Sequence, residues 1–254
     1  RDSSTSRGLG DVYKRQEQWA AKNTPDVWCM QEVRAPQNEI DPIFDEFGFE
    51  YATAGRIADQ SGLDRMNEIC RIKGRAGVGL LSALPVIDKR YGLPGLAEDV
   101  DSGRWIEADV KTPQGYTVTV VCVYVHAGNT DDPEKMKQKY RFLDTMLVRM
   151  GQLRDEAAHG GRQAVLCGDF NIAHTPLDIK NAKANEKHAG FLPEERAYVD
   201  KWLGELEFVD VMRSLYGDIQ GPYTWWSQRG RAFDNNVGWR IDYQFALSLI
   251  HISE

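Results

Sequence analysis

Short apolar runs alternate with polar stretches along the chain, and their spacing predicts a mixture of strands and helices. Residues 26–33, 77–82, 104–110, 116–125 and 164–171 form apolar or alternating runs, several of them β-branched, as is typical of buried strands. The run at 116–125 is the clearest, because it is β-branched and aromatic almost throughout.

Two longer segments place apolar side chains at helical spacing. Residues 132–154 begin with an aspartate and a proline, a cap followed by proline at the first helical position. Residues 193–206 begin with acidic side chains that favour a helix N-terminus, and shorter helices are expected at 17–22 and 42–49. Strands outnumber helices and no repeat or linker divides them, so we predict one domain of packed sheets with flanking helices.

Composition and charge narrow the class of protein. Of 254 residues, 42% are hydrophobic and 27% are charged, as in globular proteins, and no run approaches the roughly 18 apolar residues that span a membrane. The net charge of −7 argues against non-specific binding to a polyanion, although a local basic cleft or a divalent cation would still permit it. No CxxC pair occurs, so we expect reduced core thiols in a cytoplasmic protein at Cys29, Cys70, Cys122 and Cys167.

The two ends differ from the rest of the chain. Residues 1–16 are polar and aperiodic, without the apolar core of a signal peptide, and residues 247–254 stop abruptly. Both resemble translated sequencing-adapter sequence, and natural termini are the alternative. We therefore expect residues 17–246 to form the folded domain.

Polar residues at the ends of predicted strands are the candidates for chemistry. In the run at 164–171, alternation places Asp169 and Asn171 on one side of the strand and Phe170 in the core. Burying a carboxylate beside a carboxamide is unfavourable unless a metal-bound water or a phosphate meets them, whereas the structural alternative is a capped strand end. Three further polar side chains lie at or near strand ends, namely Glu32, Tyr124 and Asp242.

These candidates offer oxygen ligands and almost no imidazole or sulfur, which suits Mg²⁺ or Mn²⁺. Such an ion usually takes one or two carboxylates and completes its shell with water and substrate phosphate. The set therefore predicts metal-assisted phosphoester chemistry. For single residues a structural role stays open: packing for Tyr124, and an exposed strand end for Glu32.

Aromatic and basic residues in the last third of the chain suggest a contact with nucleic acid. Trp225, Trp226 and Trp239 are interleaved with Arg229 and Arg231, a pattern that fits stacking on bases or sugars, with an aromatic core corner as the alternative. The polar segment at 173–191 is long for a loop in a compact domain, and such loops are usually functional or disordered.

Six motifs occur in an order that resembles a known family. They are CMQEVR, GVGLLS, Tyr124 at a strand end, GDFNIAH, NEKHAGFLPEER and NVGWRIDY. In this order they resemble the exonuclease III family of apurinic/apyrimidinic endonucleases, most of all its actinobacterial members, over about 17–246. The resemblance implies a four-layer α/β sandwich, two packed mixed sheets with helices outside, with the first and last strands missing here.

The resemblance also implies a role for each candidate. Glu32 holds the metal, Asp169 positions or deprotonates the attacking water, and Asn171 orients that water. Tyr124 donates to a phosphate oxygen or assists the departing oxygen, and Asp242 supports a catalytic histidine. The implied substrate-binding residues are Asn185 at the phosphate, His188 where the family often has an asparagine, and Trp225, Trp226, Trp239 and Ile241 around the abasic sugar.

Two features of the family are expected to be missing. One is an asparagine on an opening strand, and the other is the catalytic histidine in a Ser-Asp-His sequence, which the 254 residues do not contain. His251 follows Asp242 but has no aspartate before it. Without this imidazole, hydrolysis by the chain is expected to be slower by on the order of 10²–10⁴-fold.

With the resemblance, the sequence predicts a Mg²⁺-dependent DNA-repair nuclease that hydrolyses phosphodiesters at abasic sites and at 3′ ends of duplex DNA, as a monomer without a membrane partner. One alternative is a phosphodiesterase or phosphatase of the same fold acting on lipid or inositol phosphates, which the polar segment around Asn185 disfavours. Another is a non-catalytic protein that binds damaged DNA, which the intact Glu32, Asp169 and Asn171 disfavour.

Overall fold

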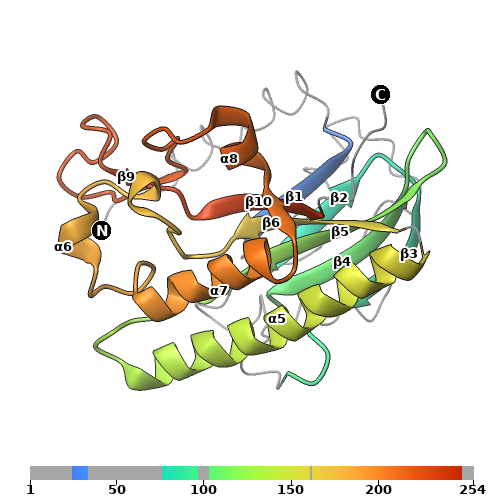
Figure 1. The fold of residues 1–254 in the computed structure, drawn as a ribbon, viewed down its shortest axis with the longest axis horizontal. Coiled ribbons are helices and arrows are strands. Elements are labelled where there is room, and N and C mark those ends of the chain that lie inside the picture. The colour runs from blue at the N-terminus through green and yellow to red at the C-terminus, as the bar shows by residue number, and fades with distance from the viewer. Residues whose placement is uncertain (1–24, 34–75, 97–102, 161, 248–254) are drawn as a thin grey trace, which may run out of the picture.

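The computed structural model describes residues 25–33, 76–96, 103–160 and 162–247, and these build two packed sheets with helices on one side (Figure 1). The strands of the two sheets are β1 (Val27–Val33), β2 (Gly77–Ser82), β3 (Val86–Tyr91), β4 (Trp105–Lys111), β5 (Thr117–Tyr124), β6 (Gln163–Asp169), β7 (Phe208–Asp210) and β10 (Asp242–Leu247). The helices are α5 (Pro133–Gly160), the 3₁₀ turn η1 (Pro176–Asp178), α6 (Ala182–Asn185), α7 (Pro193–Gly204) and α8 (Val211–Tyr216). A short ribbon, β8 (Trp225–Trp226) with β9 (Gly238–Trp239), completes the set.

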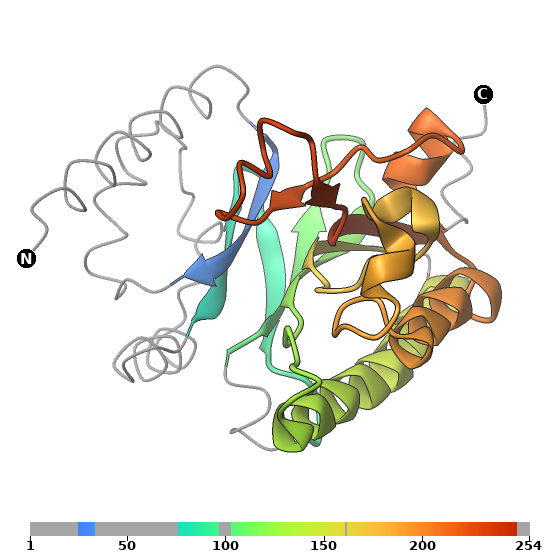
Figure 2. The ribbon, with the colours of Figure 1, turned by 90° about the vertical axis from the view of Figure 1, so that its left-hand side faces the viewer.

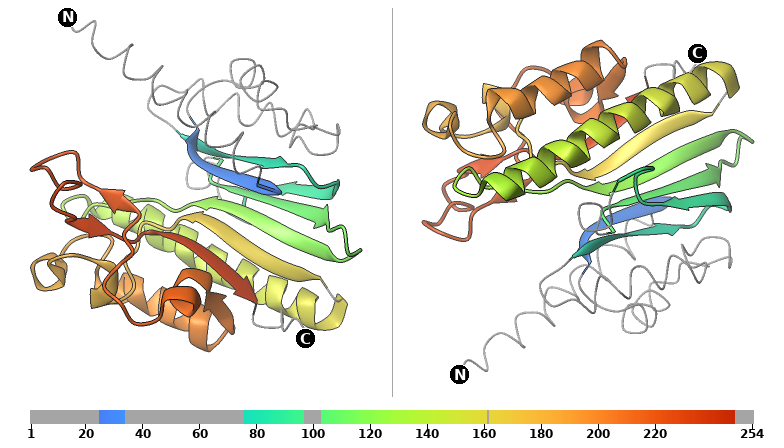
Figure 3. Two further views of the ribbon diagram at one scale, coloured as in Figure 1. Left: turned by 90° about the horizontal axis from the view of Figure 1, so that it is seen from above. Right: turned by 90° about the horizontal axis from the view of Figure 1, so that it is seen from below.

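The larger sheet has the order β3-β4-β5-β6-β10-β7 and is mixed, because β5 and β6 are parallel while their other neighbours run antiparallel. The antiparallel pair β1-β2 forms the second sheet. In Figure 3, this pair lies on one face of the larger sheet and α5 on the other. The predicted α/β class with packed sheets and flanking helices is confirmed, and the helices expected at 17–22 and 42–49 lie outside the described residues.

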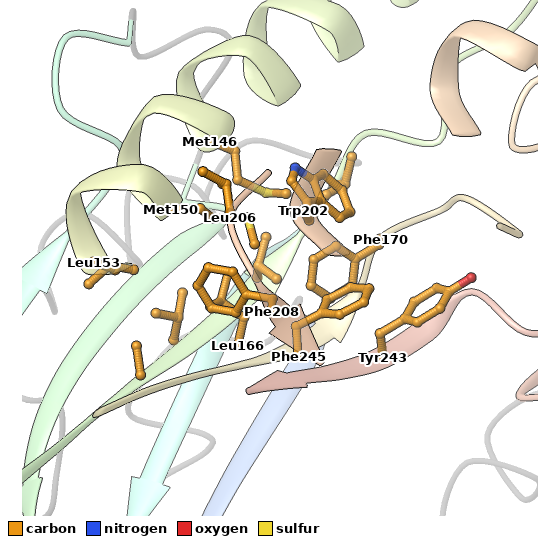
Figure 4. Packing of buried hydrophobic residues seen from close by; sticks show 14 of the residues in the cluster. Met146, Met150, Leu153, Leu166, Phe170, Trp202, Leu206, Phe208, Tyr243 and Phe245 are labelled. Carbon is orange, nitrogen blue, oxygen red and sulfur yellow. The ribbon is translucent and has the colours of Figure 1, made fainter. Parts of the chain in front are cut away.

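Two apolar cores hold these layers together. One core lies between the larger sheet and the helices α5 and α7. It includes a cluster of aromatic side chains, in which Phe170 and Phe245 pack edge to face at 5.0 Å between ring centroids (Figure 4). The inward position expected for Phe170 is thus present, since its side chain has no exposed surface. Between the two sheets, the core consists of residues such as Val78, Leu80 and Ile106.

The cysteines that the structure describes are free thiols within the strands, with Cys122 in β5 buried and Cys29 in β1 and Cys167 in β6 half-buried. Cys70 lies outside the described residues. Within the parts of the chain that the structure covers, no helix is long and apolar enough to cross a bilayer.

The observed elements differ from the sequence prediction, and three differences are informative. The helix expected at 132–154 continues to Gly160 as α5, because no residue before it stops a helix. The strand β3 was not predicted, since Val86 is its one buried residue and the apolar signal is weak. The segment at 173–191, expected as a long loop, contains η1 and α6.

Candidate active site

Three candidate residues meet because of strand pairing. Parallel β5 and β6 make Tyr124 and Asp169 direct partners, and antiparallel β10 makes Asp242 the partner of Asp169 on the other side. The three residues therefore lie next to each other across adjacent strands, at the edge where β5 and β6 end (Figure 1). Their convergence depends on sheet order, which strand patterns alone do not reveal.

Glu32 reaches this edge from the second sheet. The pairing of β1 with β2 is irregular between Met30 and Val33, and Glu32 adopts a left-handed backbone with φ 55°. The Tyr124 hydroxyl donates to Glu32 Oε1 at 2.6 Å. The irregularity in β1 thus coincides with the residue that joins the two sheets at the site.

The turn after β6 depends on Gly168 and Asn171. A Cβ on Gly168 would lie 1.9 Å from the carbonyl oxygen of Val123, so only glycine allows β5 and β6 to approach here. Asn171 has a left-handed φ of 51°, a conformation that asparagine tolerates better than most residues. Its backbone N–H and its Nδ2 donate to the two carboxylate oxygens of Asp169 at 2.8 and 3.2 Å. Asn171 thereby fixes the orientation of that carboxylate.

The carboxylates carry more negative charge than their surroundings neutralise. Burial, the charge of Asp242 and the charge of Glu32 raise the pKa of Asp169 to about 7. Burial also raises the pKa of Asp242, which a hydrogen bond to Thr224 only partly offsets. Among the residues described, neither Asp169 nor Asp242 forms an ion pair with a lysine or an arginine. Such a set is suited to receive a cation or a polarised ligand.

Tyr124 and Arg104 form the opposite wall of the site. Burial and the neighbouring Glu32 raise the pKa of Tyr124 to about 12, so its hydroxyl is a proton donor at neutral pH. The Arg104 guanidinium lies 4.4 Å from the centre of the Tyr124 ring and donates to the Tyr124 carbonyl at 3.2 Å. Its charge also acts on Asp169 and Glu32. Sequence analysis missed Arg104, because an arginine just before a strand carries no distinctive spacing.

A divalent cation fits this donor set. In the described part of the chain, no three His, Cys, Asp or Glu side chains form a ready-made metal cage. Mg²⁺ does not need one, because it usually takes one or two carboxylates and fills its shell with water and phosphate. The raised pKa values of Asp169 and Asp242 indicate that the negative charge at this edge is not fully neutralised by the protein. Glu32, on the other side of Tyr124, offers an accessible carboxylate for such an ion.

The tryptophans form a small aromatic unit beside this edge. Pairing of β8 with β9 sets Trp225 against Trp239, with ring centroids 6.4 Å apart and edge to face. The Trp225 side chain is 46% exposed, whereas Trp226 is half-buried against Phe233. Ile241 is buried, and Trp239 packs against its cluster. Ile241 and Trp239 thus belong to a small core, as the structural alternative expects, whereas Trp225 is exposed and its stacking on a base or sugar stays a prediction.

Asn185 and His188 lie on the segment that supports the aromatic unit. Ala182 of α6 packs against the same small cluster as Trp239, and Figure 2 shows α6 and the β8–β9 ribbon on the same side of the sheet. The Asn185 amide donates to the carbonyls of Lys180 and Asn181, at 3.5 and 3.0 Å. His188 is exposed. Both residues thus lie on a segment that contacts Trp239 through Gly190, and the Asn185 amide is bound within its own loop.

Comparison with known proteins decides the family. The sequence profile described as the Endonuclease/Exonuclease/phosphatase family matches residues 3–246. The chain belongs to this family. The exodeoxyribonuclease of Bacillus subtilis is 29% identical over 238 residues, which cover 93% of this chain and 83% of that protein. The DNA repair nuclease APEX1 of Danio rerio is 31% identical over 240 residues, covering 93% of this chain and 68% of that protein.

Solved structures extend the likeness to the fold. The structure of the 3′ phosphatase NExo from Neisseria, bound to a product DNA hairpin, has a TM-score of 0.68 and 26% identity, and the match covers 94% of this chain and 82% of that one. The chain is therefore a phosphodiester hydrolase, a DNA-repair nuclease of the AP endonuclease and exonuclease type. Members of the family generally depend on a divalent metal.

Proposed function

We propose that this chain hydrolyses phosphodiester bonds at abasic sites and at 3′ ends of duplex DNA, with Mg²⁺ as its metal and Mn²⁺ as a substitute. The observation that carries this proposal is the set of oxygen ligands where β5 and β6 end. Asp169 and Asp242 are half-buried partners on β6 and β10, buried Tyr124 is the partner of Asp169 on β5, and exposed Glu32 accepts the Tyr124 hydroxyl. Such a set serves phosphate chemistry better than it serves stability, because buried carboxylates without cationic partners destabilise a fold.

Each residue then has a defined task. Asp169, whose carboxylate Asn171 orients, holds and deprotonates the attacking water. The high pKa of Tyr124 keeps its hydroxyl protonated, so that it can donate to a phosphate oxygen or to the departing oxygen. Glu32 is the residue that would hold Mg²⁺, which supplies positive charge against the charge that develops on the phosphate. Asp242 adds negative charge beside Asp169. By resemblance it would support the histidine of a Ser-Asp-His sequence, which the 254 residues do not contain.

Recognition of the abasic sugar is assigned to the aromatic unit. The open face of Trp225 and the edge of Trp239 offer an apolar surface that a sugar without its base can contact. Asn185 and His188, on the adjoining segment, contact the flanking phosphates once DNA is bound. A cytoplasmic location and a monomeric state complete the proposal, and a gel-filtration mass with and without DNA tests the second.

A substrate panel under single-turnover conditions tests the proposal, with protein in excess because the 254 residues lack the Ser-Asp-His sequence and slow turnover is expected. We expect Mg²⁺-dependent cleavage of a duplex with one abasic site, slower removal of 3′ nucleotides, and no hydrolysis of inositol phosphates. EDTA should abolish cleavage. Hydrolysis of inositol phosphates in preference to DNA would overturn the proposal, as would EDTA-insensitive binding of abasic duplex without any cleavage.

A further inference from the structure

Lys139 and Glu195 form a buried ion pair for which the proposed chemistry gives no role. Lys139 lies in α5 and Glu195 in the first turn of α7, and neither side chain has exposed surface. Replacing a buried ion pair by apolar side chains is often neutral for stability, because desolvation offsets most of the attraction. The other contacts of these two side chains lead to the candidate active site.

The Lys139 ammonium joins the two strand exits that carry the candidate catalytic residues. Besides the carboxylate of Glu195, it donates to the carbonyl of Ala127 at 3.1 Å and to the carbonyl of Asn171 at 2.9 Å. An ammonium has three donors, so all of them are used. Ala127 follows Tyr124 out of β5, and Asn171 follows Asp169 out of β6.

Glu195 fixes a second point, the turn that lies between the Asp169 loop and the aromatic unit. Its Oε2 accepts the N–H groups of Gly190 and Leu192 at 2.6 and 3.0 Å. A Cβ on Gly190 would lie 3.1 Å from the Trp239 ring and 3.2 Å from the Asn171 carbonyl oxygen. Gly190 is therefore held between the residue that orients Asp169 and the tryptophan that faces the sugar.

We propose that the Lys139–Glu195 pair sets the position of Asn171 relative to Trp239. The pair thereby fixes the distance between the carboxylate that acts on the phosphate and the ring that contacts the sugar. Lys139 and Glu195 are then positioning residues that act through Asn171 and Gly190. The inference rests on the proposed function for its catalytic readout. Since the N–H and amide of Asn171 orient Asp169, a displacement of about 1 Å at Asn171 is expected to lower the rate about 10²-fold.

A matched pair of variants separates positioning from stability. Lys139→Met removes the cation of this pair, and Arg149→Met removes the cation of a second buried pair, Arg149–Glu107, about 15 Å further along the same helix. Both variants are expected to lose stability. Per folded molecule, Lys139→Met should lower kcat on abasic duplex about 10²-fold with little change in KM, while Arg149→Met should leave both nearly unchanged. Lys139→Arg should recover part of the rate.

Two further variants keep the test decisive if Lys139→Met does not fold. Lys139→Met combined with Glu195→Met replaces the pair by apolar side chains, which should restore stability but not kcat. Glu195→Gln keeps an acceptor near Gly190 while removing the charge, and should lower kcat as well. Recovery of both stability and kcat in the double variant would overturn the inference, as would equal kcat for Lys139→Met and Arg149→Met.

Amide hydrogen exchange gives a readout that does not depend on DNA. The double variant should exchange faster than the unmodified chain at the N–H groups of Asn171 and Gly190, and Arg149→Met should not. If the unmodified chain cleaves no abasic duplex, the proposed function fails, whereas unchanged exchange at both amides in the double variant would contradict the positioning role by itself.

Discussion

Two sets of carboxylates near β10 differ in how their charge is compensated: Asp178 and Asp210 are buried, and Asp169 and Asp242 are half-buried. Asp178 and Asp210 are matched by Arg240, which donates to Asp178 at 2.7 Å and to both oxygens of Asp210 at 3.0 and 2.7 Å. Although burial alone would raise the pKa of Asp178, hydrogen bonds from Arg240 hold it below the ordinary value. Asp169 and Asp242 are half-buried on the neighbouring strands β6 and β10, where no described lysine or arginine forms an ion pair with them, and their pKa values are raised.

The first set stabilises the fold through its ion pairs, whereas the second set has uncompensated negative charge that a bound ligand can neutralise. The first set joins η1, β7 and the strand entry before β10, and it holds the recognition segments in place. The second set, with Glu32 opposite, leaves negative charge where a cation and a phosphate can enter.

The largest effect is expected from Asp169→Asn. The amide cannot accept the proton of the attacking water, so single-turnover cleavage of abasic duplex should fall by about 10³-fold or more. Asp178→Asn is the matched control, since it removes one charge from the paired set. It should lower stability but leave the cleavage rate per folded molecule nearly intact. Equal loss of rate in the two variants would remove the distinction between the sets.

A large loss of stability is expected from Arg240→Met. This variant leaves Asp210 buried without its cation and Asp178 with Arg213 alone. Removal of one partner from a buried ion pair typically costs about 3–5 kcal/mol. Urea unfolding measures the effect, with Arg229→Met as the control at an exposed loop position. If both arginine variants unfold at the same urea concentration, Arg240 has no structural role of the kind described.

The acid dependence of stability should separate the two sets with a smaller effect. A lowered pKa at Asp178 contributes stability above its unfolded pKa near ~3.9, and this is lost as pH falls through the folded value. A raised pKa at Asp169 has the opposite sign, because folding then favours the protonated form. Without metal, stability should fall as pH rises from ~4 toward the folded pKa of about 7.

Asp169→Asn should reduce the decline between these pH values while keeping the acid loss, and Asp178→Asn should reduce the acid loss while keeping the decline. Urea titrations at several pH values in metal-free buffer measure both limbs. A pH profile that is the same for the two variants would show that the sets do not differ in ionisation.

Most of the long strands and helices and the strand-end candidates could be predicted from the sequence. Alternation in the run at 164–171 is enough to separate Phe170 from Asp169 and Asn171, because a strand has a period of two. The β-branched run at 116–125 likewise identifies Tyr124 as a strand-end residue. The edge strand β3 could not be found in this way, since only Val86 in it is buried.

Contacts between distant segments could not be predicted. Arg104 reaches the site through the pairing of β4 with β5, and Lys139 reaches Glu195 through the crossing of α5 and α7. Neither has a local pattern, because their partners are chosen by tertiary packing. Asn185 is the opposite case. It lies in a recognisable motif, but its side chain donates to the carbonyl of Asn181 in its own loop.

The most direct test of the difference between the sets is the effect of Mg²⁺ on thermal stability. Binding to the folded state alone adds about 1.4 kcal/mol at ten times the dissociation constant. We predict that Mg²⁺ raises the Tm of the unmodified chain and of Asp178→Asn, and that Glu32→Gln loses most of this rise. A Tm that Mg²⁺ leaves unchanged in the unmodified chain, or raises equally in Glu32→Gln, would contradict the account.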